Sequence, residues 1–291
     1  MAVTMVDVGG GVELCAETFG DPEDPAVLLL GGVTSSMDWW EPAFCQALAD
    51  AGRLVVRYDH RDTGRSTTWP VGEPGYTGDD LSLDPLRLLD GLVDGMGIAA
   101  AHLVGVSMGG GIAQDLAVRF PDRVLSLTLV ATTCAFERRD RRPLPPMEPR
   151  VREQLEEDAG ALDWSDADAV VEEQVRVQRV YAGGLGIDEA RVRAIGRQVV
   201  ERSVDPHSGV VNHWMVVGGG DDGPARTMAE IHAPTLVVHG TDDPMFPLPH
   251  GEALAREISG ARLLVVQGMG HEPPPPPTWD QVLPAIVEHT A

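Results

Sequence analysis

Short apolar runs alternate with helix-like stretches along most of this chain, and that alternation strongly limits the possible folds. The runs are rich in valine and leucine, too short for helices, and mostly bounded by glycine, aspartate or proline. Such continuous runs indicate strands that are buried on both faces of a parallel sheet. We expect these strands at residues 26–30, 54–56, 102–106, 124–130, 235–238 and 263–266.

The segments around these strands complete the predicted architecture. Residues 3–8 and 12–17 flank a Gly-Gly-Gly turn, which predicts an antiparallel hairpin at the sheet edge. Alternation of strands and helices predicts an α/β fold, with a mostly parallel central sheet flanked by helices. Helices are expected at residues 41–51, 83–93, 109–119, 250–258 and 280–288.

The middle of the chain has a different pattern, with charged, helix-favouring residues and no convincing strand. Val192, Ile195 and Val199 share one face of an amphipathic helix, and Val170, Val177 and Tyr181 suggest another. We therefore expect a helical cap at residues 136–231, inserted after the sixth strand. Residues 1–135 and 232–291 would then form one core domain.

A Gly-x-Ser-x-Gly sequence at residues 105–109 lies between an expected strand and an expected helix. The glycines allow a sharp turn that leaves the Ser107 hydroxyl exposed at the end of the strand. The dipole of the following helix favours negative charge that develops nearby. Ser107 is therefore the candidate nucleophile.

A serine nucleophile needs a base, and the base needs a third group to orient it. His271 follows the last expected strand in a glycine-flanked loop, whereas the other histidines are interpreted as structural. Asp243 and its neighbour Asp242 both follow the preceding strand, so either could orient the imidazole. We favour Asp243, and we interpret Glu272 as a surface carboxylate of the loop.

An oxyanion hole should complete this site. One donor is expected to be the amide of Met108, directly after the nucleophile. The second should come from the loop that follows Leu30, where Val33 is the favoured donor and Gly32 the alternative. A donor of this kind contributes about 3–4 kcal/mol in the transition state.

With these residues assembled, the chain resembles the α/β-hydrolase fold superfamily and, within it, the aclacinomycin methylesterases of anthracycline biosynthesis. The resemblance implies that Ser107, Asp243 and His271 are nucleophile, acid and base. It also implies that the Asp-His-Arg-Asp-Thr-Gly-Arg-Ser stretch is a structural loop near the active site, without catalytic residues. The segments that carry the resemblance are residues 30–33, 57–66, 105–109 and 268–273.

These residues predict a serine esterase that works through an acyl-enzyme, without metal or organic cofactor. Trp39, Phe136 and Trp214 are candidate substrate-binding residues, which favours an apolar or aromatic ester such as an anthracycline methyl ester. The same triad could serve a peptidase, lactonase, thioesterase, carbon–carbon bond hydrolase or perhydrolase. A ligand-binding protein without catalysis is the alternative outside enzymes.

Composition restricts the partners and the compartment. The 45 acidic residues outnumber the 22 basic ones and give a net charge of −23, which disfavours nucleic acid and anionic membranes as partners. All 22 basic residues are arginines, so Schiff-base and Walker A lysine chemistry are excluded. The three scattered cysteines and the apparent lack of a signal peptide predict a cytoplasmic protein.

Overall fold

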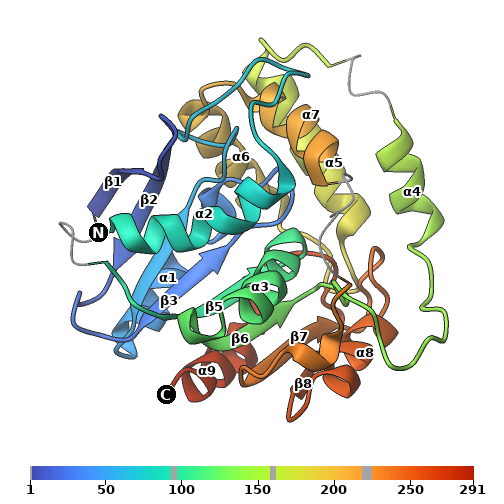
Figure 1. Cartoon of the computed structure of the whole chain (residues 1–291). Helices are drawn as coiled ribbons and strands as arrows, with labels where there is room; N and C mark the ends of the chain where they lie inside the picture. Colours follow the sequence, from blue (N-terminus) through green and yellow to red (C-terminus); the bar gives the residue numbers. More distant parts are fainter. Residues whose placement is uncertain (1, 93–96, 158–161, 218–224) are drawn as a thin grey trace.

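The computed structural model describes residues 2–92, 97–157, 162–217 and 225–291, which contain an eight-stranded sheet (Figure 1). The strand order is β1-β2-β4-β3-β5-β6-β7-β8. β2 runs antiparallel to both β1 and β4, and the remaining neighbours are parallel. The strands are β1 (Ala2–Asp7), β2 (Glu13–Phe19), β3 (Ala26–Leu30), β4 (Leu54–Tyr58), β5 (Ala101–Val106), β6 (Val124–Val130), β7 (Thr235–Gly240) and β8 (Arg262–Val266).

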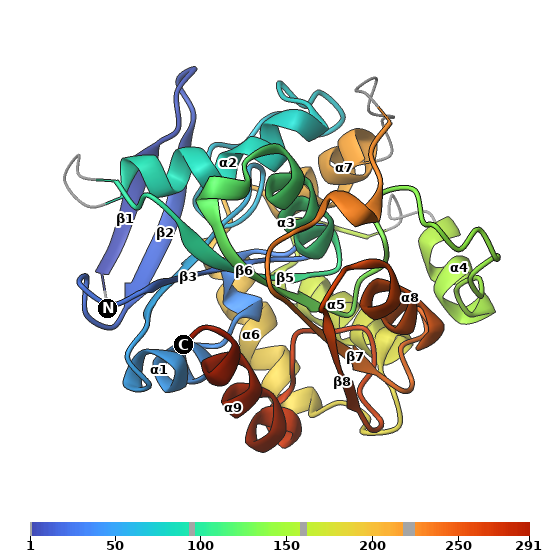
Figure 2. The same cartoon turned by 60° about the horizontal axis from the view of Figure 1, so that its bottom comes forward.

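Helices cover both faces of this sheet, as the alternating pattern predicts (Figure 2). The side chains of α1 and α9 pack on one face, and those of α2, α3 and α8 pack on the other. In β3, Leu28 and Leu30 belong to one buried cluster while Val27 and Leu29 belong to the other. The five helices are α1 (Pro42–Asp50), α2 (Gly78–Gly91), α3 (Met108–Arg119), α8 (Pro249–Glu257) and α9 (Trp279–His289).

Helix α2 begins five residues before its expected start at residue 83. Thr77 and Asp80 form a capping box, in which each side chain accepts a hydrogen bond from the other residue's backbone amide. This cap stabilises a first turn whose polar residues carry no apolar periodicity. The expected end of the helix at Val93 lies outside the described residues.

Among the described residues, the segment between β6 and β7 contains four α-helices and no strand of the sheet, and its assignment as a cap domain at residues 136–231 stays a prediction. Val192, Ile195 and Val199 form its expected buried helix face. A backbone bridge between Glu137 and Thr227 joins the two ends of the insertion. The helices are α4 (Pro149–Glu156), α5 (Ala167–Tyr181), α6 (Glu189–Arg202) and α7 (Pro206–Val217).

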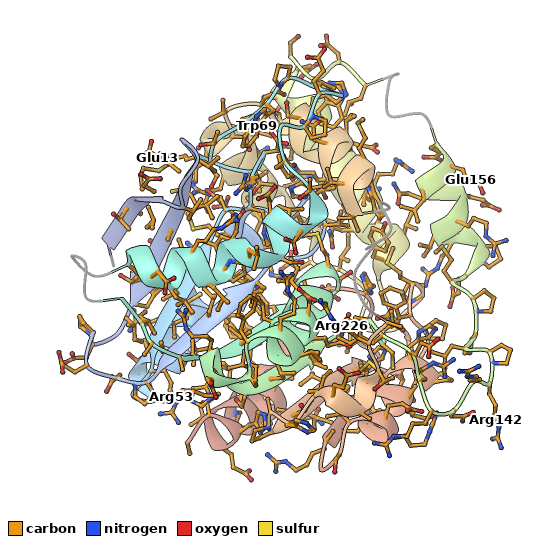
Figure 3. All side chains as sticks on the ribbon, viewed as in Figure 1. Glu13, Arg53, Trp69, Arg142, Glu156 and Arg226 are labelled. Carbon is orange, nitrogen blue, oxygen red and sulfur yellow. The ribbon has the colours of Figure 1, made fainter. Side chains whose placement is uncertain are left out.

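The exposed side chains of the insertion include charged residues as well as apolar ones such as Val204 and Met215. Figure 3 shows the exposed side chains of Arg142 and Glu156 pointing away from the rest of the protein. Within the described ranges, no helix combines the length and apolar character that crossing a membrane would require.

Candidate active site

Ser107 lies at a sharp turn between β5 and α3. Its φ of 52° is in the left-handed region, which is rare for a residue other than glycine and marks a constrained backbone. A Cβ atom on Gly105 would lie 2.3 Å from the carbonyl oxygen of Gly109, and one on Gly109 would lie 2.5 Å from that of Leu30. Both glycines are therefore required by the close approach of backbone segments at this turn.

The structure brings Ser107, His271 and Asp243 together from the carboxyl ends of three strands. The Nε2 atom of His271 is 3.0 Å from the Oγ of Ser107. On the other side of the ring, Nδ1 is 3.0 Å from the Oδ2 of Asp243 and 3.2 Å from Oδ1. Because the carboxylate accepts a hydrogen bond from Nδ1–H, Nε2 is left unprotonated and able to accept the hydroxyl proton of the serine.

Asp243 is held in place by its own loop. The amides of Met245 and Phe246 donate to its Oδ1 over 2.9 and 2.8 Å. Burial would raise the pKa of Asp243, but His271, its neighbour His239 and the loop amides together lower it below its usual value. The carboxylate therefore stays ionised and able to stabilise a charged imidazole.

The adjacent Asp242 has a separate role in the structure. Its exposed carboxylate accepts hydrogen bonds from the amide of Gly184 over 2.9 Å and from the hydroxyl of Thr241 over 2.8 Å. It thus connects the β7 loop to the insertion and does not contact His271. Of the two alternatives left by the sequence, the geometry favours Asp243.

The expected oxyanion donors lie around Ser107. Met108 is the first residue of α3, so its amide has no acceptor within the helix. Gly32 and Val33 both line the cavity beside Ser107, and a Cβ atom on Gly32 would lie 3.6 Å from the Cβ of Ser107. The loop therefore approaches the nucleophile closely, and the assignment of Val33 or Gly32 as second donor stays a prediction.

A buried histidine from the insertion holds this loop. The Nδ1 of His213 in α7 accepts the amide of Thr34 over 2.9 Å, and its Nε2 donates to the carbonyl of Arg61 over 2.7 Å. Burial lowers the pKa of His213, which favours the neutral ring that this bonding requires. Thr34 has a φ of 64°, a strained value for a β-branched residue that its surroundings must maintain.

Replacing His213 with alanine should lower kcat for ester hydrolysis roughly 10- to 100-fold, because the oxyanion loop loses its support while the triad stays intact. Steady-state kinetics would measure the effect. His232, which is exposed in a loop, provides a matched alanine control. An unchanged kcat in a folded His213→Ala variant would contradict this role.

The Asp-His-Arg-Asp-Thr-Gly-Arg-Ser stretch contacts the same loop and the segment that follows it. Asp59 accepts the amide of Met37 over 2.9 Å and that of Arg65 over 3.0 Å. The ring of His60 lies 3.3 Å from the carbonyl oxygen of Gly31, and burial lowers its pKa to about 3. These contacts fit the structural role that the resemblance implies for this stretch.

A cavity of about 590 Å³ opens beside Ser107 and His271, between the strand ends and the insertion. Trp39 and Trp214 line it, as the sequence predicts, and Trp214 remains 43% exposed. Trp164 and Tyr181 from the insertion line it as well, although they are absent from the predicted site. The helical periodicity that marks Tyr181 indicates a packing face but does not indicate a cavity.

Phe136 is a correction to the predicted substrate-binding residues. It lies outside the residues that line the cavity and packs instead against the core cluster beneath α2 and α3. The guanidinium of Arg226 covers its ring, with the Cζ atom 5.9 Å from the ring centroid. The chain turns after β6, so a position following a strand end does not by itself lead into the cavity.

Glu272 is a second correction, because it is buried and not on the surface of the loop. Glu272 is only 8% exposed, and it lines the cavity together with the neighbouring His271. Burial raises the pKa of Glu272 to about 7. A single sequence gives no signal for this, since the burial comes from contacts with distant parts of the chain.

Known proteins that resemble this chain identify its family. Residues 25–161 match the family described as alpha/beta hydrolase fold, and residues 212–276 match the family described as TAP-like protein. Rhodomycin D methylesterase of Streptomyces peucetius is 33% identical over 282 residues, which cover 90% of each protein. The chain belongs to the α/β-hydrolase family. This confirms the fold class and the resemblance seen in the sequence.

Two further proteins resemble this chain over most of its length, one in structure and one in sequence. A 2-hydroxy-6-oxo-6-phenylhexa-2,4-dienoate hydrolase from Rhodococcus sp. strain RHA1 superposes with a TM-score of 0.73 at 22% identity, covering 99% of this chain and 98% of that one. A poly(3-hydroxyalkanoate) depolymerase of Ectopseudomonas oleovorans is 25% identical over 262 residues, covering 87% of this chain and 80% of that protein. This α/β-hydrolase thus resembles proteins that are named for several different activities.

Proposed function

We propose that this α/β-hydrolase is a serine esterase that cleaves the methyl ester of a bulky aromatic polyketide, such as an anthracycline. The observation that carries the proposal is the continuous hydrogen-bonded chain from Ser107 through His271 to Asp243, with 3.0 Å at each link. The relative at 33% identity over 90% of each chain is named as a methylesterase, which supports this ester class.

The geometry supports the following sequence of steps. His271 takes the proton of Ser107 as the serine oxygen attacks the ester carbonyl, and the amides of Met108 and of Val33 or Gly32 stabilise the resulting oxyanion. His271 then gives the proton to the departing methoxide, which leaves as methanol and forms an acyl-enzyme. Water attacks this acyl group with His271 as base, which releases the carboxylic acid and restores Ser107.

The cavity supports a large aromatic acyl group. Its volume of about 590 Å³ is within the usual range for small-molecule sites. Indole and phenol rings provide flat apolar walls, which suit stacking against fused aromatic rings. The cavity-lining aromatic residues are Trp39, Trp164, Tyr181 and Trp214.

We place this activity in the cytoplasm as part of the same proposal. All three cysteines are free thiols, and Cys15 and Cys45 are buried. Unpaired cysteines suit a reducing compartment. A small-molecule ester is the proposed partner, and the negative net charge of −23 disfavours nucleic acid and anionic membranes.

A panel of esters tests the proposed function. We expect methyl esters of fused-ring aromatic acids to be hydrolysed with a kcat/KM at least about 100-fold above that of methyl acetate, because the remote contacts are used in the transition state. Chromatographic detection of methanol and of the free acid would identify the bond that is cleaved. Equal kcat/KM values across the panel would contradict the proposed preference for aromatic esters. Absence of methanol among the products would contradict the proposed methylesterase activity.

A further inference from the structure

Glu272 has an unusual environment for an acidic residue in an active-site cavity. Its Oε1 atom is fully buried and has no hydrogen-bond partner in the described part of the chain. A buried carboxyl group without a partner is costly, because the protein does not replace the hydrogen bonds lost from water. The described part of the protein therefore supplies no hydrogen-bond donor to Oε1, and a bound ligand could supply one.

The other acidic residues that line the cavity are satisfied. Glu173 binds Arg176 through both carboxylate oxygens, at 2.8 and 2.7 Å, and Glu157 is 2.8 Å from the same guanidinium. Asp62 accepts from the amide of Trp69, the hydroxyl of Tyr76 and the amide group of Asn212. Among the described acidic residues of the lining, Glu272 alone lacks such partners.

The charges near Glu272 do not pair with it. Arg191 is close enough to lower its pKa, but the guanidinium is bound to Glu41, with Nε and Nη2 both 2.8 Å from Oε1 of that residue. His271 also lowers the pKa of Glu272, but its ring nitrogens are used by Asp243 and Ser107. Glu272 is thus surrounded by groups that are already engaged.

We propose that Glu272 binds a hydrogen-bond-donating group of the substrate, a hydroxyl or a protonated amine, close to the ester that is cleaved. The proposal rests on the proposed function, because it takes the cavity ligand to be the ester substrate. Glu272, His271 and Ser107 line the same cavity, so a substrate that fills it and presents its carbonyl to Ser107 also presents other substituents to the wall that Glu272 forms. In a largely apolar cavity, one such polar contact fixes the orientation of the ligand.

Binding of matched ligands to Ser107→Ala tests this without turnover. The probes are three fused-ring aromatic methyl esters that carry a hydroxyl, an aminomethyl or a methyl group at one position beside the ester. Quenching of tryptophan fluorescence would report Kd, since three tryptophans line the cavity. We expect the hydroxyl or aminomethyl ester to bind roughly 10- to 100-fold more tightly than the methyl ester, as a charge-assisted hydrogen bond allows.

Second-site variants identify the residue responsible. Adding Glu272→Ala should reduce the ratio of Kd values to about 1, while Glu172→Gln, which changes an ion-paired acid outside the cavity lining, should leave the ratio unchanged. Glu272→Gln distinguishes the two donors, because an amide oxygen still accepts from a hydroxyl but does not neutralise an ammonium group.

Three results would overturn the proposal: no binding of any probe, equal Kd values for all three probes, or a ratio that survives Glu272→Ala. These failures are distinguishable from failure of the proposed function. That function is tested separately by methanol release from the methyl-substituted ester with Ser107 intact. Hydrolysis without donor selectivity would remove only the role of Glu272.

Discussion

Replacing Ser107 with alanine should lower kcat for ester hydrolysis by roughly 10⁴- to 10⁶-fold. The hydroxyl is the atom that forms the acyl-enzyme, and neither His271 nor Asp243 can replace it as nucleophile. The remaining activity would come from the oxyanion donors and from substrate binding alone. Steady-state and single-turnover kinetics with an aromatic methyl ester would measure the loss.

Two controls separate this loss from misfolding. The alanine methyl group fits wherever the serine side chain does, so the thermal unfolding midpoint should change little. Ser203 also lines the cavity, but its hydroxyl donates to the carbonyl of Val199 over 2.7 Å, so Ser203→Ala should retain activity. A fluorophosphonate should label the wild type and Ser203→Ala once per chain and leave Ser107→Ala unlabelled. Near-wild-type turnover by Ser107→Ala would contradict the proposed mechanism.

The central strands β3 to β7 could be predicted because they are buried on both faces. A strand such as β3 contacts helices on either side, so every position is apolar and the run is visible in the sequence. The start of α2 has no such signal, since the Thr77 capping box determines its first turn without any apolar periodicity. Local propensity and burial thus predict the elements better than their ends.

The three triad positions follow from the same logic. Parallel strands place their carboxyl ends at one edge of the sheet, so loops after β5, β7 and β8 meet there although they are far apart in the sequence. The choice between Asp242 and Asp243 needed coordinates, because adjacent side chains differ only in direction. Whether a carboxylate such as Glu272 is buried depends on distant segments that pack around it, and a single sequence does not reveal these contacts.

The stretch at residues 59–66 shows how much of the site depends on such distant contacts. Arg202, at the end of α6, donates to the buried Asp59 over 2.7 Å and also binds the buried Asp38. Asp59 in turn accepts the amide of Met37, in the segment that follows the oxyanion loop. Through these two buried carboxylates and one guanidinium, the insertion is connected to the segment that follows the oxyanion loop.

Replacing Arg202 with methionine should therefore lower the free energy of unfolding by about 3–5 kcal/mol at pH 7, because two buried carboxylates lose their common cation. Urea unfolding would measure the change. Burial already raises the pKa of Asp59 above its usual value, against the effect of Arg202, and removing the guanidinium would raise it further. An acid with a raised native pKa binds more protons when folded, so stability is gained as the pH falls through that pKa.

The deficit of Arg202→Met should accordingly shrink as the pH is lowered from 8 to 5, which a loss of packing alone would not produce. Arg193 on the same helix offers a matched control, since its partners Glu172 and Glu189 lie at the protein surface, where solvent screens the ion pairs. Arg193→Met should leave the unfolding midpoint nearly unchanged at every pH. A deficit independent of pH would mean that Arg202 acts through the packing of its aliphatic chain, and the two carboxylates would then need no cation to remain buried.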